Sequence, residues 1–203
     1  MIIMNIKSGQ NAEVKCSNLT MKHSFLPLAL FLVLFLLSAC GAPTAGDAWT
    51  VYHATSDTLV SPEFSPYSFE YPSYWRLEEG VNHITFASEG KLLEDPPETL
   101  EPGQIIAGLS INVNMAPEEL VETYTSSLGS MTEFQEPVSV RLNGRAAVYQ
   151  QGTNLETGDL TFALAVDMGE ETRGLLTARM AGGEFEKWEE ILFKMAGSLR
   201  VGG

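Results

Sequence analysis

Histidine, the side chain most often used for proton transfer and metal binding near neutral pH, is sparse in this chain. The three histidines are His23, His53 and His83, and they are widely separated along the sequence. A zinc site needs three or four ligands, which one isolated histidine does not supply. We expect His83, near the start of an alternating stretch, to be an ordinary residue at the surface or edge of a sheet. The sequence therefore predicts no metal site and no cofactor.

Nucleophilic catalysis needs a serine or cysteine beside a base that a third group holds in place. None of the patterns G-x-S-x-G, G-x-G-x-x-G, P-loop or H-E-x-x-H occurs in the sequence. Ser110 follows Gly108 and Leu109, but the second glycine of a nucleophile motif is missing and the serine falls in the middle of an expected strand. We therefore expect a protein that is not an enzyme, with a hydrolase of the cell envelope as an alternative.

Carboxylates are plentiful, and an acidic insert over residues 89–103 concentrates them. Calcium is bound by oxygen ligands, so these side chains could gather around a calcium ion, although the spacing of an EF-hand is absent. A calcium-binding or small-ligand-binding protein is therefore a second functional hypothesis. The stretch 154–159 (NLETGD) also resembles a calcium loop faintly, but its place between two expected strands favours a turn. The acidic candidates in the insert are Glu89, Glu94, Asp95, Glu98 and Glu101.

A cysteine stands where a long apolar run stops. Residues 25–37 (FLPLALFLVLFLL) form 13 positions without a charge, with Lys22 just before them. A bilayer span needs about 20 apolar residues, whereas a run of this length is typical of a signal-peptide core. The run closes with L-S-A-C at residues 37–40, which resembles a bacterial lipobox. The resemblance implies that the thiol of Cys40 carries diacylglycerol and that cleavage makes Cys40 the first residue of the mature chain.

The lipobox divides the N-terminal part of the sequence. A signal beginning at Met21 has an ordinary design over 21–39, so residues 1–20 are interpreted as a wrongly assigned N-terminal extension. Cys16 lies before the apolar run and leaves with the leader. The mature chain is therefore expected to hold neither a disulfide nor a free thiol.

A tether is expected to follow the anchor, over residues 40–65, because this stretch is rich in glycine, alanine, threonine, serine and proline. Trp49, Val51 and Tyr52 interrupt its polar run, which indicates that part of it packs on the domain. The globular domain is expected over residues 66–203.

The charge of the chain indicates which partners it avoids. Three of the 12 basic residues and one of the 26 acidic residues precede residue 40, so 9 basic and 25 acidic residues remain, a net charge of −16. Such a body repels the phosphates of nucleic acids and anionic membrane surfaces. We expect no nucleic-acid binding, and contact with the membrane only through the lipid on Cys40.

Alternation and turn residues predict an antiparallel sheet covered by helices, an α+β fold. In residues 105–115, one face should carry the apolar side chains of every second residue from Ile105 to Met115. A helix should begin at Pro117, and a second should follow Gly182 and Gly183. The insert 89–103 has no clean period and is expected to be an exposed loop. The other expected strands cover 67–71, 75–79, 82–88, 138–142, 145–151, 160–168 and 174–180, with Asn143-Gly144 as a type I′ hairpin turn.

The stretch 69–75 has the form F-x-Y-P-x-x-W, and the chain ends with a helix that closes on M-A-G-S-L-R at 195–200. Together with the order of strands and helices, this resembles the PsbP-like group of small domains over roughly residues 66–201. The resemblance implies an α/β/α sandwich. The known relatives are mostly assembly or binding proteins without catalysis, and none of their functional residues can be placed on this sequence.

These observations favour a lipid-anchored protein on the extracytoplasmic face of the cell membrane or outer membrane. Its expected role is a non-catalytic module that binds or helps to assemble another envelope protein. The two alternatives are the small-ligand or calcium-binding lipoprotein and the envelope hydrolase.

Overall fold

The computed structural model describes residues 48–54, 66–80, 83–169 and 171–202. The predicted leader, the lipobox and Cys40 lie outside the described residues. Within the described ranges, no helix combines the length and the apolar character needed to cross a membrane.

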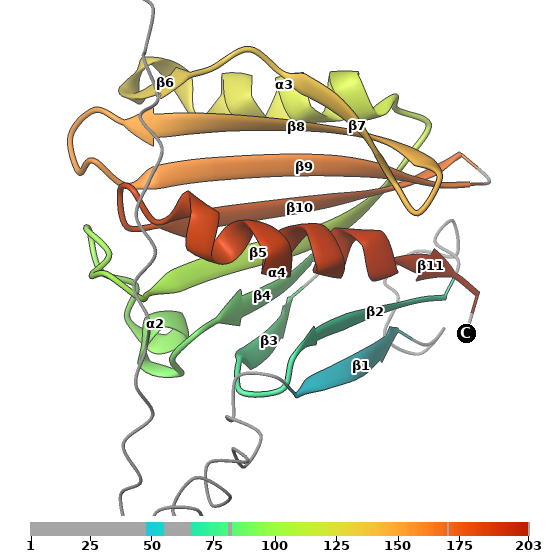
Figure 1. Cartoon of the computed structure of the whole chain (residues 1–203), viewed down its shortest axis with the longest axis horizontal. Helices are drawn as coiled ribbons and strands as arrows, with labels where there is room; N and C mark the ends of the chain where they lie inside the picture. The colour runs from blue at the N-terminus through green and yellow to red at the C-terminus, as the bar shows by residue number, and fades with distance from the viewer. Residues whose placement is uncertain (1–47, 55–65, 81–82, 170, 203) are drawn as a thin grey trace, which may run out of the picture. The chain divides into compact units, whose positions relative to one another are not determined.

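A large antiparallel sheet forms the centre of the fold (Figure 1). Every neighbouring pair of its strands is antiparallel, which confirms the predicted fold class. A further strand, β7 (Val138–Leu142), pairs with β8 (Arg145–Asn154) beside the short β6 (Thr132–Phe134). The spatial order of the other strands is β3 (Arg76–Gly80), β4 (His83–Ala87), β5 (Ile105–Val113), β10 (Thr172–Met180), β9 (Leu160–Gly169), β8 (Arg145–Asn154) and β6 (Thr132–Phe134).

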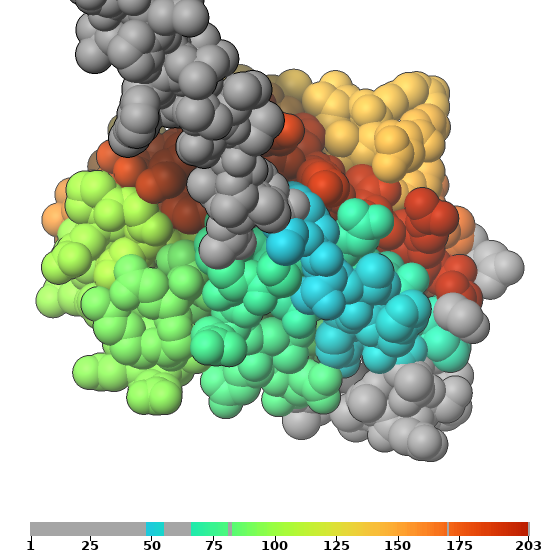
Figure 2. All heavy atoms as spheres, turned by 60° about the horizontal axis from the view of Figure 1, so that its bottom comes forward, coloured from blue at the N-terminus to red at the C-terminus, as the bar shows by residue number. Residues whose placement is uncertain are grey.

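A second sheet of three strands, which the sequence did not predict, consists of β1 (Trp49–Ala54), β2 (Tyr67–Pro72) and β11 (Arg200–Val201). The strand β1 belongs to the stretch expected to be a tether, and the structure pairs it with β2 along its whole length. The three apolar residues noted in that stretch are therefore part of the fold. Lys194 of the C-terminal helix lies 3.8 Å from the ring centroid of Trp49. In Figure 2 the cyan surface of β1 lies beside that of β2.

The main core lies between one face of the large sheet and a layer formed by the small sheet and α4 (Phe185–Ser198), which crosses in front of the large sheet in Figure 1. The helical spacing of apolar residues predicted this helix, and Trp188, Leu192 and Met195 on it are buried. Trp75, from the F-x-Y-P-x-x-W stretch, meets Trp188 edge to face with ring centroids 6.0 Å apart.

The opposite face of the sheet is covered in part by α3 (Pro117–Ser127). Leu120 and Val121 of α3 pack on Ala163 and Ala165 of β9, whose small side chains let the helix approach the sheet closely. Helices therefore lie on both faces, as the predicted sandwich requires. Consecutive side chains of β9 point to opposite faces of the sheet, and most of them are buried because both faces of this strand are covered. Gly129, with φ of 64°, begins the short 3-10 helix η1 (Gly129–Met131) that follows α3.

The end of β5 differs from the prediction. Alternation placed Met115 on the same face as Ile105, but the strand ends at Val113. Asn114 adopts a left-handed φ of 63°, and its N–H donates to the carbonyl of Glu171. The reversal of direction at Asn114 moves Met115 to the other side of the sheet, where it packs with the residues beneath α3.

The acidic insert is also more ordered than the exposed loop predicted for it. It contains one short helix, α2 (Lys91–Glu94), and a small core of its own. Leu92 and Leu100 are 2% and 4% exposed and pack with Ala87 and Ala181. The prediction was wrong here because two isolated leucines make no periodic pattern, although each fills a site on the sheet.

Candidate functional site

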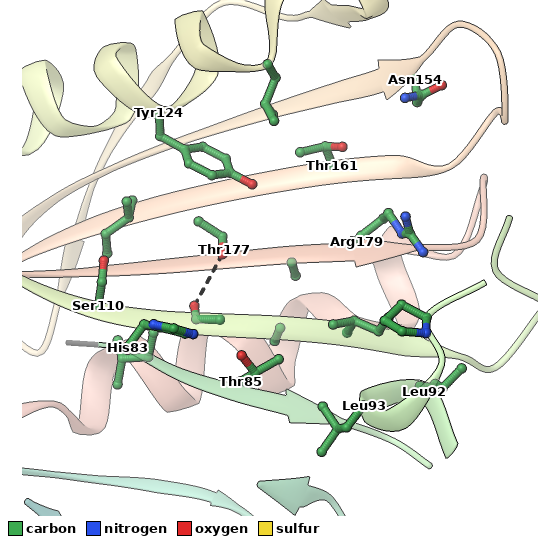
Figure 3. Close-up of a pocket in the computed structure, with 18 of the residues that line it drawn as sticks. His83, Thr85, Leu92, Leu93, Ser110, Tyr124, Asn154, Thr161, Thr177 and Arg179 are labelled. Carbon is green, nitrogen blue, oxygen red and sulfur yellow. Dashed lines mark hydrogen bonds between the residues drawn. The ribbon is translucent and has the colours of Figure 1, made fainter. Parts of the chain in front are cut away.

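On the sheet face that carries α3, the described residues leave an uncovered area between α3 and the insert that contains α2. The helix contacts β8, β9 and β10, whereas β5, β4 and β3 continue the sheet beyond it. A groove with a volume of about 750 Å³ lies over this uncovered area (Figure 3). Pockets that bind small ligands have volumes of roughly 300 to 1,000 Å³. The groove is therefore the candidate functional site.

The middle of the groove floor is a row of residues set by the register of four strands. Glu78 pairs with Thr85, Thr85 with Gly108, and Gly108 with Thr177, so their side chains point to one face. A Cβ atom on Gly108 would lie 3.0 Å from Oγ1 of Thr177. The absence of a side chain on Gly108 therefore gives the Thr177 hydroxyl room to lie over the glycine.

The next row, two residues along the strands, contains the residues closest to a catalytic pair. Gly80 pairs with His83, His83 with Ser110, and Ser110 with Leu175. The ring of His83 lies over Gly80, where a Cβ atom would be 2.3 Å from Cε1 of the imidazole. The hydroxyl of Ser110 accepts a hydrogen bond from the side-chain amide of Asn112 at 3.2 Å.

The wall on the α3 side is formed by Tyr124 and Leu128. Figure 3 shows the Tyr124 hydroxyl extending from the helix toward Thr177. Burial raises the pKa of Tyr124, and a hydrogen bond with Thr177 opposes that rise. Thr177 in turn donates to the carbonyl of Gly108 at 3.4 Å. Tyr124 is therefore a neutral phenol near pH 7, able to donate or accept a hydrogen bond.

The opposite wall is the insert, which contributes Leu92, Leu93 and Pro96. Arg179 of β10 holds this wall to the sheet, because its Nη2 donates to the carbonyl of Pro97. Figure 3 shows Arg179 at this end of the groove, away from Ser110 and His83. The predicted loop is thus a fixed wall.

A buried carboxylate completes this attachment. Asp159 is 1% exposed, and its Oδ2 lies 3.5 Å from Nε of Arg179. Both oxygens of Asp159 also accept from the N–H of Leu100, at 3.3 and 3.2 Å. Burial raises the pKa of Asp159, while the Leu100 N–H and the charge of Arg179 lower it by less. The charge of Arg179 is therefore already paired and is not free for an anionic ligand.

The sequence 154–159 is the turn that the prediction favoured. Oδ1 of Asn154 accepts from the N–H groups of Glu156 and Thr157, at 2.9 and 3.0 Å, so the side chain is used to build the turn. The turn places Asn154 in the lining of the groove near Met131 and Thr132.

The insert carboxylates do not form the calcium site that was considered. In the part of the chain that the structure describes, no three His, Cys, Asp or Glu side chains lie close enough to share a metal ion. Glu89 instead forms an ion pair with Lys91 at 3.1 Å and accepts from Gln104. These two hydrogen-bond partners lower the pKa of Glu89. The calcium hypothesis therefore has no support from the described residues.

Sequence reasoning missed the groove itself. Its signal was the second face of residues 105–113, where Gly108, Ser110 and Asn112 alternate with buried apolar residues. A polar face on a central strand normally faces solvent, and here it forms the floor of the groove. The uncovered area of the sheet follows from where α3 packs, which the pattern of β5 does not specify.

No family model matches the sequence, and no curated protein matches it. Solved structures are similar to it at low identity. The cyanobacterial PsbP of Synechocystis sp. PCC 6803 is 12% identical, with a TM-score of 0.44 over 82% of this chain and 99% of that chain. LpqN of Mycobacterium tuberculosis, described as involved in cell envelope biogenesis, is 14% identical, with a TM-score of 0.47 over 77% of this chain and 93% of that one.

A third similar structure is PA94 of Pseudomonas aeruginosa, described as a protein of unknown function and putative regulator. It is 11% identical, with a TM-score of 0.35 over 70% of this chain and 89% of that chain. A PsbP is among the similar structures, as the resemblance in the sequence led us to expect. At these identities the likeness concerns the fold alone.

Proposed function

We propose that this protein is a lipid-anchored, extracytoplasmic binding protein without catalytic activity, which uses the groove to hold a segment of another envelope protein. The observation that carries the proposal is the uncovered area of the sheet, where the groove presents neutral hydroxyl groups between apolar walls. Sites of this composition bind and orient a partner through a few polar contacts, with apolar area supplying most of the affinity.

The anchor supports the location. The L-S-A-C sequence after a short apolar run is the feature that directs export and acylation. A diacylated cysteine carries two chains, and two chains give the stable membrane attachment that one does not. Anchoring would hold the acidic domain outside the cytoplasm, at the surface where envelope proteins assemble.

The location is tested by fractionation and mass spectrometry of the full-length protein. We expect the membrane fraction to contain a chain that begins at Cys40 and carries the mass of a diacylglyceryl group. The Cys40→Ala variant should lose that mass and leave the membrane fraction. A wild-type chain with an unmodified thiol, or one retained in the cytosol with its leader, would show that the anchor is absent.

Binding is tested by covalent capture in intact envelopes. A cleavable amine-reactive crosslinker should recover the same partner protein in independent preparations from the wild-type strain. The reaction should lose that partner in the Cys40→Ala strain, in which the domain is no longer held at the membrane. Failure to recover any reproducible partner would contradict the proposed role.

The hydrolase alternative has one specific observation in its favour, the cross-strand pairing of Ser110 with His83 in the groove. Against it, Ser110 lies within β5 and not on the sharp strand-to-helix turn that presents the serine of a G-x-S-x-G motif. A fluorophosphonate probe separates the two functions. We expect no labelling of the wild type, and labelling that disappears in Ser110→Ala would establish the hydrolase.

A further inference from the structure

We infer that the occupant of the groove is an extended, positively charged peptide segment, with apolar side chains at alternate positions. This inference rests on the proposed function and specifies the partner of the same site. It follows from three features of the groove: its charge, the spacing of its floor, and its opening at the edge of the sheet.

The charge of the groove favours a cation. Glu78 lines it, and the insert residues Glu94 and Asp95 lie between the lining residues Leu93 and Pro96. All three acidic residues are exposed. The lining arginine, Arg179, is paired with the buried Asp159 and bonded to the insert. Arg76, an exposed arginine two residues before Glu78, lies on the same face of β3. The three exposed carboxylates outnumber it, so a lysine or arginine in the occupant is favoured over a phosphate or carboxylate.

The spacing of the floor matches an extended chain. Its three rows are two residues apart along the strands, which is about 6.6 Å. Alternate side chains of an extended peptide are separated by the same distance. The row of Ser110 offers Leu175, and the middle row has Gly108, which carries no side chain. A third row, two residues further from Ser110, has Ile106, which packs with Leu93 of the insert wall on the same small core. Three alternate side chains of the occupant can therefore contact one row each.

The groove is also open where a peptide would have to enter. Its floor ends at β3, which is the edge strand of the large sheet, so no further strand among the described residues closes that side. The hydroxyl groups of Thr85, Ser110 and Thr177 are neutral donors and acceptors, suited to the amide and carbonyl groups of a peptide. Glu78 and His83 lie at this open side, which is the place for the basic residue of the occupant.

The test is a selection from a displayed library of random seven-residue peptides on the full-length protein purified in detergent. Bound peptides are compared with those recovered on Ser110→Phe and Thr85→Phe, two variants that fill the floor. We expect the wild type to enrich sequences with lysine or arginine and with apolar residues two positions apart. Both filling variants should lose this enrichment.

Two matched variants control for unspecific effects. Thr153→Phe places the same ring at an exposed threonine of β8, on the other face of the sheet. Glu190→Gln removes an exposed carboxylate from α4, also away from the groove. An enriched peptide should bind these two controls as it binds the wild type. Its affinity should fall about 10-fold or more in the filling variants and about 2- to 5-fold in Glu78→Gln, an exposed ion pair.

The results separate this inference from the proposed function. If the selection enriches acidic peptides, or none whose binding depends on the groove, the inference is overturned. The same holds if Ser110→Phe and Thr85→Phe bind the enriched peptide as the wild type does. If the wild type and a folded filling variant capture the same partner equally in envelopes, the groove is not the binding site. The proposal of a membrane-anchored binding protein is unaffected by that result. Circular dichroism identifies any variant that fails to fold, and the other filling variant then decides the result.

Discussion

Replacing Asp159 by alanine tests how the groove wall is held. The change leaves the N–H of Leu100 without its acceptor and Arg179 without its charge partner. An unsatisfied buried N–H costs about 1–3 kcal/mol. Breaking a buried pair costs about 3–5 kcal/mol, but Arg179 is 36% exposed and water recovers part of that cost. We expect the free energy of unfolding in urea to fall by about 3 kcal/mol.

Asp159→Asn is the matched variant, because an amide retains one oxygen acceptor at the same position. We expect it to cost about 1 kcal/mol or less near pH 7. In Asp159→Ala, hydrogen exchange should accelerate over residues 89–104, which form the wall, and remain unchanged in α4. A loss of stability within about 0.5 kcal/mol, typical of an uncoupled surface site, would refute the reasoning.

The pH dependence of the free energy of unfolding provides a second test of Asp159. Its pKa in the folded state is raised above 3.8, chiefly by burial, so the folded protein binds this proton more tightly than the unfolded chain does. The stability associated with the bound proton is therefore present at low pH and is lost as pH rises from about 3.8 through the folded pKa. Relative to Asp159→Asn, the wild type should lose stability as pH increases across that interval. The opposite slope would show that Arg179 outweighs burial.

Three further changes have outcomes that urea unfolding can measure. Arg145→Ala should cost about 1–3 kcal/mol, because this side chain donates to carbonyls at the C-terminal end of α4, whereas the exposed Arg141→Ala should cost almost nothing. Burial, with a smaller effect of the charge of Glu79, raises the pKa of Tyr67 to about 12. The tyrosine of the unfolded chain therefore ionises first, so the wild type should lose stability relative to Tyr67→Phe as pH rises from 10 to 12. An equal pH dependence of the two proteins would contradict this. Leu92→Ala should cost about 2–4 kcal/mol and the half-buried Leu93→Ala clearly less; equal costs would mean that the insert core is not formed.

The sheet was predictable because apolar and polar residues alternate along its strands. Its turns contain residues that readily adopt positive φ values. Asn143 and Gly144 have φ values of 50° and 83°, as a type I′ turn requires, and the strands on either side pair as expected. The helix α4 was equally clear, because its buried residues recur at helical spacing. Patterns of this kind are set by residues that are close in the sequence, so they can be recognised without knowing the rest of the fold.

The small sheet and the insert core could not be predicted because they depend on contacts between distant residues. The strand β1 is stabilised by pairing with β2, and Leu100 is held by Asp159, which lies 59 residues further along the chain. The groove depends on tertiary packing, because it exists only where α3 contacts β8, β9 and β10 and leaves the neighbouring strands uncovered. A polar strand face was visible in the sequence, but whether it would be covered was not.

The most direct test of the central claim places a photoreactive benzoylphenylalanine at position 131 in living cells. Met131 lines the groove and is 43% exposed, so a probe at this position can contact the occupant without filling the floor. Position 153, on the opposite face of the sheet, serves as the control. Illumination should give one discrete adduct with an envelope protein in the membrane fraction for position 131, and none for position 153. No adduct at position 131, or the same adducts from both positions, would contradict the account of the groove as the binding site of an anchored protein.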